Sequence, residues 1–381
     1  MTPHDVIVLG LGGMGSAAAY QLASRGRRVL GLDAFERGHA RGSSHGRTRI
    51  IRQAYYEAPE YVPLVQRAYQ LWRELEVESG RGLLRITGGL NVGRPDGALV
   101  AGALTSARQH GLPYEYLEPT VVAERFPAFR LTDDLVAVHE PEAGILEPEA
   151  CVGVHLDLAA RHGADLRHGE RARGWSVDGS GVRVDTDRGA YTAERLVIAA
   201  GPWASELLVD LQLPLAVQRV VNIHFEPIRP ELFGPDRCPV HIWEIPEGQY
   251  YGIPALPEQG VKFGRHDAGE ICNPHTIRRD VDAEEIEALR TVLDRYLPGA
   301  AGDVKWTLTC MYTNTPDRHF VIDRHPRHDQ VVYACGFSGH GFKFASVVGE
   351  TLADLATDGE TRHPIAFLSA GRLDSSVVTI P

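Results

Sequence analysis

Residues 6–35 read VIVLGLGGMGSAAAYQLASRGRRVLGLDAF, and this stretch decides the expected fold. Its pattern predicts a strand, a tight glycine turn, a helix with small residues on one side, and a second strand that ends at Asp33. Gly10, Gly12 and Gly15 are spaced G-x-G-x-x-G: the first permits the turn, the second admits a pyrophosphate, and the third lets helix pack against strand. Asp33 can accept hydrogen bonds from a ribose hydroxyl. The stretch predicts a Rossmann-like dinucleotide-binding unit and leaves NAD and FAD open.

Composition and charge exclude several classes of protein. The chain has 381 residues, enough for two lobes, and a net charge of -11, which disfavours a nucleic-acid binder because that affinity depends on clustered lysine and arginine. No apolar run approaches the roughly 20 residues that a membrane helix needs. The N-terminus runs into a strand pattern without a basic segment and a long apolar one. We expect a cytoplasmic protein with no nucleic-acid partner and no membrane partner.

Cysteine and histidine spacing gives no sign of a metal site. The cysteines are odd in number, scattered, and never spaced C-x-x-C, so neither a disulfide framework nor a zinc site is expected. The 17 histidines include no H-E-x-x-H pattern. The five cysteines are Cys151, Cys238, Cys272, Cys310 and Cys335.

The segment after Asp33 contains a small-residue loop over 42–46, followed by Arg49 and Arg52. The two arginines, three positions apart, could share one face of a helical turn and bind an anion, and their spacing equally fits a solvated basic face. An amphipathic helix is predicted next, because apolar residues recur at helical spacing. These predicted core residues are Val62, Val65, Ala68, Leu71, Trp72 and Leu75.

Five segments together carry a family resemblance. They are GLGGMG (10–15), GSSHGRTRIIRQAY (42–55), YYGIPAL (250–256), CMYTNTPDRHFVID (310–323) and GFSGHGFKF (336–344). In this order, and across almost the whole chain, they resemble the monomeric sarcosine oxidase and N-methyltryptophan oxidase family of flavoproteins. The resemblance implies FAD as the cofactor and a monomer as the working form.

In that family the cofactor is bound covalently, through a cysteine sulfur on the 8α carbon of the flavin. The resemblance places Cys310 of the CMYT segment at the tethering position, where neighbouring cations would favour the thiolate. Cys335, in YACGFSGHG, competes for this role but falls where the family needs no thiol. We expect covalent FAD on Cys310 and a structural Cys335.

The expected fold is α/β (α+β overall), with a Rossmann-like FAD-binding domain and a second, mostly antiparallel β-sheet substrate domain flanked by helices. Two later segments are expected to return to the first lobe. One contains a helix and strands, the last of which ends at Gly201, and the other is a C-terminal strand, glycine loop and helix. Short strands between turn residues suggest the second sheet, and residues 282–300 contain its clearest helix, with Gly299 after the helix end. We predict a discontinuous FAD-binding domain over 1–83, 145–216 and 318–381, and a substrate domain over 84–144 and 217–317.

The remaining site residues are assigned by resemblance. Lys262 matches the lysine that assists the reaction with O2, since a fixed cation stabilises the negative charge that develops when O2 is reduced. Arg52 and Lys343 match the pair that holds the substrate carboxylate, and Lys343 also lies near the flavin. Without the motifs these would be ordinary surface or helix-flanking residues.

A second group is expected to surround the flavin and the substrate. His45 and Arg49 match a basic pair near the flavin ring, and Ser43 belongs to the same cofactor-binding loop. The residues that match the lining of the substrate site are Tyr251, His266 and Tyr312. Without the motifs, buried aromatic residues and satisfied histidines would be the ordinary interpretation.

The chain departs from the family in the loop. Where the family usually reads SHHGDTRIIRHAY, this sequence has Ser44, Arg47 and Gln53. Arg47 in place of an acid changes the local charge by two units, which leaves the pH optimum and the substrate choice open. Trp243, next to the strand that leads to Tyr251, is expected to narrow or shape the pocket.

The resemblance implies oxidation of a secondary amine. An N-methyl amino acid would dock its carboxylate on Arg52 and Lys343, and its N-methyl carbon would be oxidised to an imine that hydrolyses to formaldehyde and a primary amino acid. O2 would be reduced to hydrogen peroxide near Lys262. Two alternatives remain: a flavoenzyme for glycine, a D-amino acid, pipecolate or proline, or a flavin-binding subunit that hands electrons to a partner.

Overall fold

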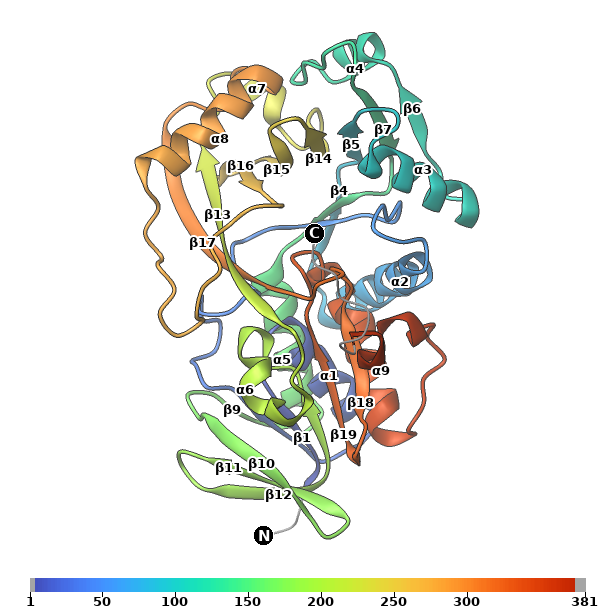
Figure 1. The fold of residues 1–381 in the computed structure, drawn as a ribbon, viewed down its shortest axis with the longest axis vertical. Coiled ribbons are helices and arrows are strands. Elements are labelled where there is room, and N and C mark those ends of the chain that lie inside the picture. The colour runs from blue at the N-terminus through green and yellow to red at the C-terminus, as the bar shows by residue number, and fades with distance from the viewer. Residues whose placement is uncertain (1–3, 374–381) are drawn as a thin grey trace.

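The computed structural model describes residues 4–373, which contain two large β-sheets and one small one. In Figure 1 the first sheet lies in the lower half of the molecule and the second in the upper half, and the long strands β13 (Ala216–Phe225) and β17 (Val304–Asn314) extend from one half toward the other. Helices pack on both sheets. This mixed α/β architecture, with a second, mostly antiparallel sheet, confirms the predicted fold class.

The first sheet carries the dinucleotide-binding unit. Its parallel strands lie in the order β9, β2, β1, β12 and β19, while β18 pairs antiparallel with β19, and the hairpin of β10 and β11 pairs antiparallel with β12. The strands are β1 (His4–Leu9), β2 (Val29–Leu32), β9 (Asp165–Arg167), β10 (Ala172–Asp178), β11 (Gly181–Thr186), β12 (Ala190–Ile198), β18 (Val321–His325) and β19 (His328–Cys335).

The apolar run of β1 is explained by burial on both faces of the sheet. Val6 and Val8 belong to one core cluster, and Ile7 and Leu9 to another, so successive side chains pack on opposite sides. The predicted strand, glycine turn, helix and strand are therefore confirmed. The principal helices of this half are α1 (Gly13–Ser24), α2 (Tyr61–Ser79), α5 (Pro148–Arg161), α6 (Ala204–Leu207) and α9 (Ala345–Thr357).

The second sheet is antiparallel except for one pair. Its strand order is β17, β13, β16, β15, β14, β5, β7, β6, and only β14 and β5 are parallel. The strands not yet given are β5 (Gly89–Gly93), β6 (Glu115–Leu117), β7 (Val136–Glu140), β14 (Val240–Ile245), β15 (Gly248–Leu256) and β16 (Gly260–Arg265). Four helices accompany this sheet: α3 (Ala98–His110), α4 (Pro119–Arg125), α7 (Pro230–Phe233) and α8 (Ala283–Tyr296).

Helix α8 lies within the segment predicted to be helical, and local signals fix it there. Asp282 and Glu285 form a capping box, in which each side chain accepts from a backbone amide at the helix start. Leu289, Val292 and Leu293 recur on one face and are buried. The capping box fixes where the helix begins, and the apolar stripe packs it against the second sheet.

The third sheet corrects one prediction. Arg49 begins strand β3 (Arg49–Ile51), which pairs with β8 (Gly144–Leu146), as does β4 (Leu84–Ile86). Arg49 and Arg52 therefore do not share a face of a helical turn, and that prediction is wrong. In extended backbone, residues three apart point to opposite sides. The two guanidinium groups accordingly meet different partners, as described below.

Two smaller predictions also need correction. Trp243 is 1% exposed in the core of the second sheet, and its neighbour Ile242 lines the cavity instead, because side chains alternate along β14. Trp243 does not shape the pocket. Strand β12 ends at Ile198 rather than at Gly201, which begins a short 3-10 turn (Gly201–Trp203) with φ of 53°.

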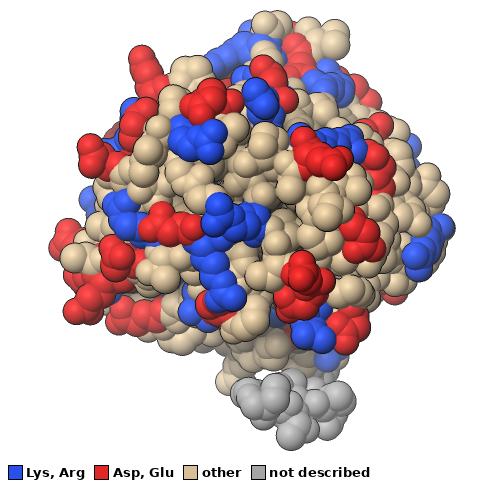
Figure 2. Space-filling view, turned by 90° about the horizontal axis from the view of Figure 1, so that it is seen from above, with Lys and Arg blue, Asp and Glu red and all other residues tan. Residues whose placement is uncertain are grey.

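The strands divide between the sheets by chain segment. The first sheet takes its strands from residues 4–32, 165–198 and 321–335, and the second takes its strands from 89–140 and 216–314. This division supports the predicted domain boundaries, which remain a proposal. Within residues 4–373, no helix is long and apolar enough to cross a bilayer. Figure 2 shows acidic and basic side chains interspersed on the face seen from above.

Candidate active site

A cavity of about 590 Å³ is lined by residues of both large sheets. It reaches from the glycine turn after β1 to strands β15, β16 and β17. Its size is typical of a small-molecule or cofactor site. Of the residues predicted for the site, those that line it are Gly10, Gly12, Asp33, Ser43, Arg49, Arg52, Tyr251, Lys262, His266, Cys310, Tyr312 and Lys343.

The glycine turn has the shape that a dinucleotide requires. Gly10 has φ of 87°, and a Cβ there would lie 2.5 Å from the carbonyl oxygen of Ala199. A Cβ at Gly15 would lie 1.7 Å from the oxygen of Gly10, so helix α1 can approach the turn only with glycine. Gly12 and Gly13, at the start of α1, line the cavity. The turn therefore fits a pyrophosphate at the helix N-terminus.

Asp33 lies at the end of β2 and is ready to accept further hydrogen bonds. Its carboxylate accepts from the amides of Leu11 at 2.8 Å and Phe35 at 2.9 Å, and His39 lies 3.5 Å away. Burial opposes ionisation, but these hydrogen bonds from His39, Leu11 and Phe35 hold the pKa of Asp33 below its ordinary value. The carboxylate is charged at neutral pH and fits the ribose of the adenosine half.

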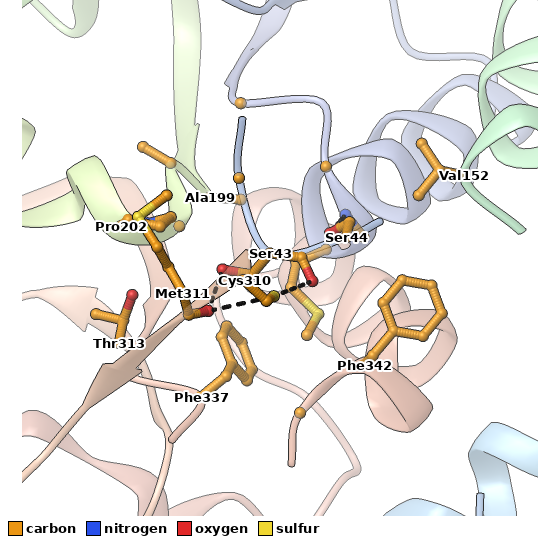
Figure 3. A pocket seen from close by; sticks show the side chains of 18 of the residues that line it. Ser43, Ser44, Val152, Ala199, Pro202, Cys310, Met311, Thr313, Phe337 and Phe342 are labelled. Atoms are coloured by element: carbon orange, nitrogen blue, oxygen red, sulfur yellow. Dashed lines mark hydrogen bonds between the residues drawn. The ribbon is translucent and has the colours of Figure 1, made fainter. Parts of the chain in front are cut away.

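Cys310 lies on β17 beside the cofactor loop (Figure 3). Nη2 of Arg49 is 3.8 Å from its Sγ, and the Ser43 hydroxyl donates to the carbonyl of Met311 at 2.7 Å. Cys310 is the one cysteine, among the described residues, that lines the cavity. Cys335 is fully buried at the end of β19, and burial raises the pKa of its thiol to about 12.

Lys262 enters the cavity from β16, an inner strand of the second sheet. Its Nζ donates to the carbonyls of Gly46 at 2.9 Å and Thr48 at 3.0 Å. The side chain is 2% exposed, and burial, together with the charge of Arg49, lowers its pKa well below the ordinary value. A lysine on an edge strand would not be held in this way.

Arg52 is paired with an acid that sequence reasoning missed. Its Nη2 lies 2.7 Å from both carboxylate oxygens of Glu57, and its Nη1 donates to the carbonyl of Ala54. Burial opposes ionisation of Glu57, but Arg52, His340 and Lys343 lower its pKa to about 2. This ion pair faces the cavity.

Lys343 lies in the short 3-10 turn Phe342–Phe344 before α9. Its Nζ donates to the carbonyl of His340 at 2.7 Å and is 3.5 Å from the hydroxyl of Tyr55. Burial and the nearby charge of Arg52 lower its pKa to about 7. Lys343 therefore changes charge near neutral pH, and a bound anion would favour its protonated form.

Three residues predicted to line the substrate site, Tyr251, His266 and Tyr312, are polar but uncharged at neutral pH. The hydroxyl of Tyr251 donates to Asn222, and the hydroxyl of Tyr312 is 3.4 Å from Nδ1 of His266. Burial lowers the pKa of His266 to about 4, and burial raises the pKa of Tyr251 to about 12. At neutral pH this side of the cavity offers hydrogen bonds without charge.

His45 does not line the cavity. Its Nε2 is 3.3 Å from the carbonyl of Thr309, and burial with the charge of Arg49 lowers its pKa to about 4. The predicted basic pair of His45 and Arg49 therefore carries one positive charge at neutral pH. A role for His45 in the site stays a prediction.

Sequence reasoning missed Glu57 and His340. His340 was part of the quoted GFSGHGFKF segment, and Glu57 follows Arg52 by five positions, but neither carried a signal that placed it in the cavity. Burial lowers the pKa of His340 to about 3. Glu57 favours the charged forms of Arg52 and Lys343, and the backbone carbonyl of His340 accepts from Lys343.

One group of metal-ligand side chains lies outside the cavity. Asp210, His325 and His328 place ligand atoms within 4.8 Å of one another. The Asp210 carboxylate already accepts from His325 at 2.9 Å and pairs with Arg327. We assign no metal to this group, because the guanidinium holds the carboxylate oxygen that an ion would need.

The glycine turn, the acid at the end of β2 and the large cavity define a dinucleotide-binding protein, and sequence comparison identifies the class as FAD-dependent oxidoreductase. The family described as FAD dependent oxidoreductase matches residues 5–355, and the chain belongs to this family. The expected enzyme class and the FAD cofactor are thereby confirmed.

Three known oxidases are similar to this chain over nearly its whole length. The chain is similar to the monomeric sarcosine oxidase of Streptomyces avermitilis, with 49% identity over 381 residues, which covers 98% of this chain and 99% of that protein. It is 36% identical to the N-methyl-L-tryptophan oxidase of Salmonella newport over 360 residues, covering 93% and 94%. The solved structure of NikD, an unusual amino acid oxidase essential for nikkomycin biosynthesis, superposes with a TM-score of 0.85 at 27% identity, covering 97% and 98%. The resemblance drawn from the sequence motifs is confirmed.

Proposed function

We propose that this protein oxidises small N-methyl amino acids, such as sarcosine or N-methyltryptophan, with covalent FAD as cofactor and O2 as acceptor. The observation that carries the proposal is the pair of buried cations, Arg52 and Lys343, in the same cavity as Lys262 and Cys310. Buried cations require anionic partners. The names of the similar oxidases support the choice of substrate class.

A substrate carboxylate fits between Arg52 and Lys343. In the structure Glu57 supplies the negative charge that both cations need. An incoming carboxylate would take over part of this role, because the planar fork of Arg52 suits a carboxylate and Lys343 adds a point charge. Held in this way, the acid group fixes the orientation of the amine.

The uncharged residues that line the cavity favour the neutral form of the substrate amine. His266, Tyr251 and Tyr312 carry no charge at neutral pH, and they enclose the site in low-dielectric surroundings. Such surroundings disfavour a protonated amine, and the neutral amine is the form that can be oxidised. When bound, FAD supplies the two-electron acceptor and passes the electrons to O2. One substrate, one O2 and one water then give formaldehyde, a primary amino acid and hydrogen peroxide.

We further propose that Cys310 holds the cofactor. The Sγ lines the cavity and lies beside Arg49, which supports a bond to the 8α carbon of the flavin. Bond formation removes one hydrogen from the thiol and one from the 8α methyl group, and O2 takes both with two electrons to give hydrogen peroxide. Lys262 lies on β16, which is separated from β17 by β13 in the same sheet, and its charge is proposed to assist the reaction with O2.

The domain boundaries, the monomeric state and the cytoplasmic location are proposed together with this function. The printed name of the similar Streptomyces enzyme supports a monomer. Light scattering on the purified protein is expected to give the mass of one chain, 41.8 kDa.

The function is tested by anaerobic bleaching of the flavin with a panel of substrates. Sarcosine or N-methyltryptophan is expected to bleach the purified enzyme faster than glycine, a D-amino acid, proline or pipecolate. Faster bleaching by proline or pipecolate would replace the proposed substrate class with cyclic amino acids. Bleaching without any O2 consumption in air would instead indicate an electron-transfer subunit.

The first prediction concerns the carboxylate clamp. A thioether acid, which has the carboxylate but no oxidisable amine, is expected to perturb the flavin spectrum and to bind more weakly in Arg52→Lys and in Lys343→Met. Arg52→Lys keeps the charge but loses the planar fork, so a loss of about tenfold or more is expected. The measurement is a spectral titration. Dissociation constants unchanged in both variants would show that the acid group is held elsewhere.

The second prediction concerns pH. Because the pKa of Lys343 is about 7, carboxylate binding is expected to be constant well below pH 7 and to weaken above it, by up to about tenfold per pH unit. The sign follows from charge: the ligand is an anion throughout, and Lys343 loses its proton as pH rises. Titrations between pH 6 and pH 9 should show this slope in the wild type and a flatter profile in Lys343→Met. Parallel profiles would remove Lys343 from the clamp.

A further inference from the structure

The loop of residues 46–48, which accepts hydrogen bonds from Nζ of Lys262, is held from two sides. Its carbonyl groups face cations: Gly46 and Thr48 accept from Lys262, and the Thr48 carbonyl also accepts from Arg49 at 2.7 Å. Its amide groups face an anion. The amide of Gly46 donates to Oε1 of Glu149 at 2.6 Å, and the amide of Arg47 lies 3.1 Å from both carboxylate oxygens.

The backbone of the loop explains why two successive amides can share one carboxylate. Gly46 has φ of 104° and Arg47 has φ of 64°, and such left-handed residues turn neighbouring amides toward one anion. A side chain at position 46 would also be excluded, because a Cβ there would lie 2.4 Å from Leu308. This conformation is unfavourable for arginine and needs an external restraint. Glu149 supplies one.

Arg47 supplies a second restraint on the outer side of the loop. Its guanidinium lies 4.7 Å from the ring centroid of Trp306, and that ring stacks on His224 at 3.7 Å. His224 pairs with Lys262 across strands β13 and β16. The arginine that departs from the family pattern therefore packs on Trp306 of β17, whose ring contacts the partner strand of the lysine through His224.

Glu149 lies at the start of α5 and reaches the loop across 103 positions of sequence. Its side chain faces the cavity. Burial and Arg49 lower the pKa of Lys262, while the charges of Cys310 and Glu149 oppose that shift. Glu149 therefore affects Lys262 in two ways: it holds the loop that contacts Nζ, and its negative charge favours the protonated lysine.

We propose that Glu149 is a positioning residue for the reaction with O2: by holding the amides of Gly46 and Arg47, it fixes the carbonyls that keep Nζ of Lys262 in place. This inference rests on the proposed role of Lys262. Glu149 touches neither of the proposed substrate cations, so its loss is expected to act mainly on the reaction with O2.

The lysine content of the chain offers a readout that is independent of turnover. The chain has only three lysines, Lys262, Lys305 and Lys343. Lys305 lies at the start of β17, is partly exposed, and pairs with Glu226 rather than with the loop. Holoenzyme labelled with ¹³C at lysine Cε therefore gives three signals, which Lys262→Met and Lys305→Met assign.

The test uses Glu149→Ala, Glu149→Gln and, as a matched control, Glu147→Ala. Glu147 precedes Glu149 on the same helix start but does not line the cavity. In Glu149→Ala the reaction of the substrate-reduced enzyme with O2 is expected to slow by up to about 100-fold, because a displaced group loses its effect steeply with distance. Anaerobic reduction should stay within about twofold. Glu149→Gln keeps an acceptor oxygen and should recover most of the rate, and Glu147→Ala should match the wild type.

The lysine signals and a double variant decide the origin of the effect. The inference requires that the Lys262 signal move in Glu149→Ala while those of Lys305 and Lys343 stay. It also requires that Glu149→Ala add little in a Lys262→Met background. Equal slowing of reduction and reoxidation, or an unmoved Lys262 signal, would overturn it. If Lys262→Met itself left the O2 reaction unchanged, the proposed oxygen role of Lys262 would fail, whatever Glu149 did.

Discussion

Cys310→Ser is expected to release the flavin on acid denaturation, whereas the wild-type chain should stay yellow after precipitation and washing. The reason is that Cys310 is the cysteine of the described cavity and lies beside Arg49, where a thioether to the 8α carbon fits. A hydroxyl at this position is a much weaker nucleophile than a thiolate. The measurement is flavin absorbance in the pellet and in the supernatant, for protein produced under the same conditions.

Cys335→Ser is the matched control. Its thiol is buried outside the cavity, with a pKa raised to about 12 by burial, so its loss should leave the flavin attached. Release of colour from the wild type, or from Cys335→Ser alone, would show that Cys310 is not the tether. The mass of the intact chain, with and without the mass of FAD, gives the same answer independently.

Lys262→Met is expected to slow the reaction of the substrate-reduced enzyme with O2 by about 10²- to 10³-fold, a typical effect of removing one preorganised electrostatic group. Methionine keeps much of the length of lysine but not the charge, and Lys262 is buried where charge is effective. Anaerobic reduction by substrate should change far less, because the charge is needed only where O2 is reduced. Stopped-flow measurements of the two half-reactions provide the comparison.

Lys305→Met removes the same charge at a partly exposed position of the second sheet, where Lys305 pairs with Glu226. It should leave both half-reactions unchanged. A Lys262→Met enzyme that reacts with O2 at the wild-type rate would contradict the role given to Lys262. An equal loss in both half-reactions would indicate a general disturbance of the cavity.

The parts of the fold that could be predicted from the sequence are those with local causes. Glycine spacing and an apolar strand define the first unit, since Gly10 and Gly15 leave no space for a Cβ. The capping box at Asp282 and the apolar stripe of α8 similarly act within one helix. Such signals lie within a few residues of one another, so a single sequence contains them.

The wrong predictions depended on partners that are distant in sequence. Arg49 and Arg52 have a spacing that fits a helical turn, but pairing of β3 with β8 makes the segment extended. Trp243 and Ile242 are both apolar, and only the packing of the second sheet decides which of them faces the cavity. The sequence predicts that neighbouring side chains of the strand point to opposite faces, but it does not show which face lines the cavity.

The acids of the site were missed for a similar reason. Glu57 and Glu149 are two of the 50 acidic residues of the chain, and nothing local distinguishes them. Their importance lies in contacts with Arg52 and with the amides of Gly46 and Arg47. The family resemblance identified the cations of the site, and the structure adds Glu57, which pairs with Arg52, and Glu149, which holds the loop that contacts Lys262.

The most direct test of the proposed function is to measure O2 uptake, hydrogen peroxide and formaldehyde in parallel during turnover with sarcosine or N-methyltryptophan. The account predicts equimolar amounts of all three from the purified protein, since each substrate molecule loses one methyl group and reduces one O2. Peroxide without formaldehyde would show that a different carbon–nitrogen bond is oxidised, and no O2 uptake with either substrate would contradict the proposed oxidase.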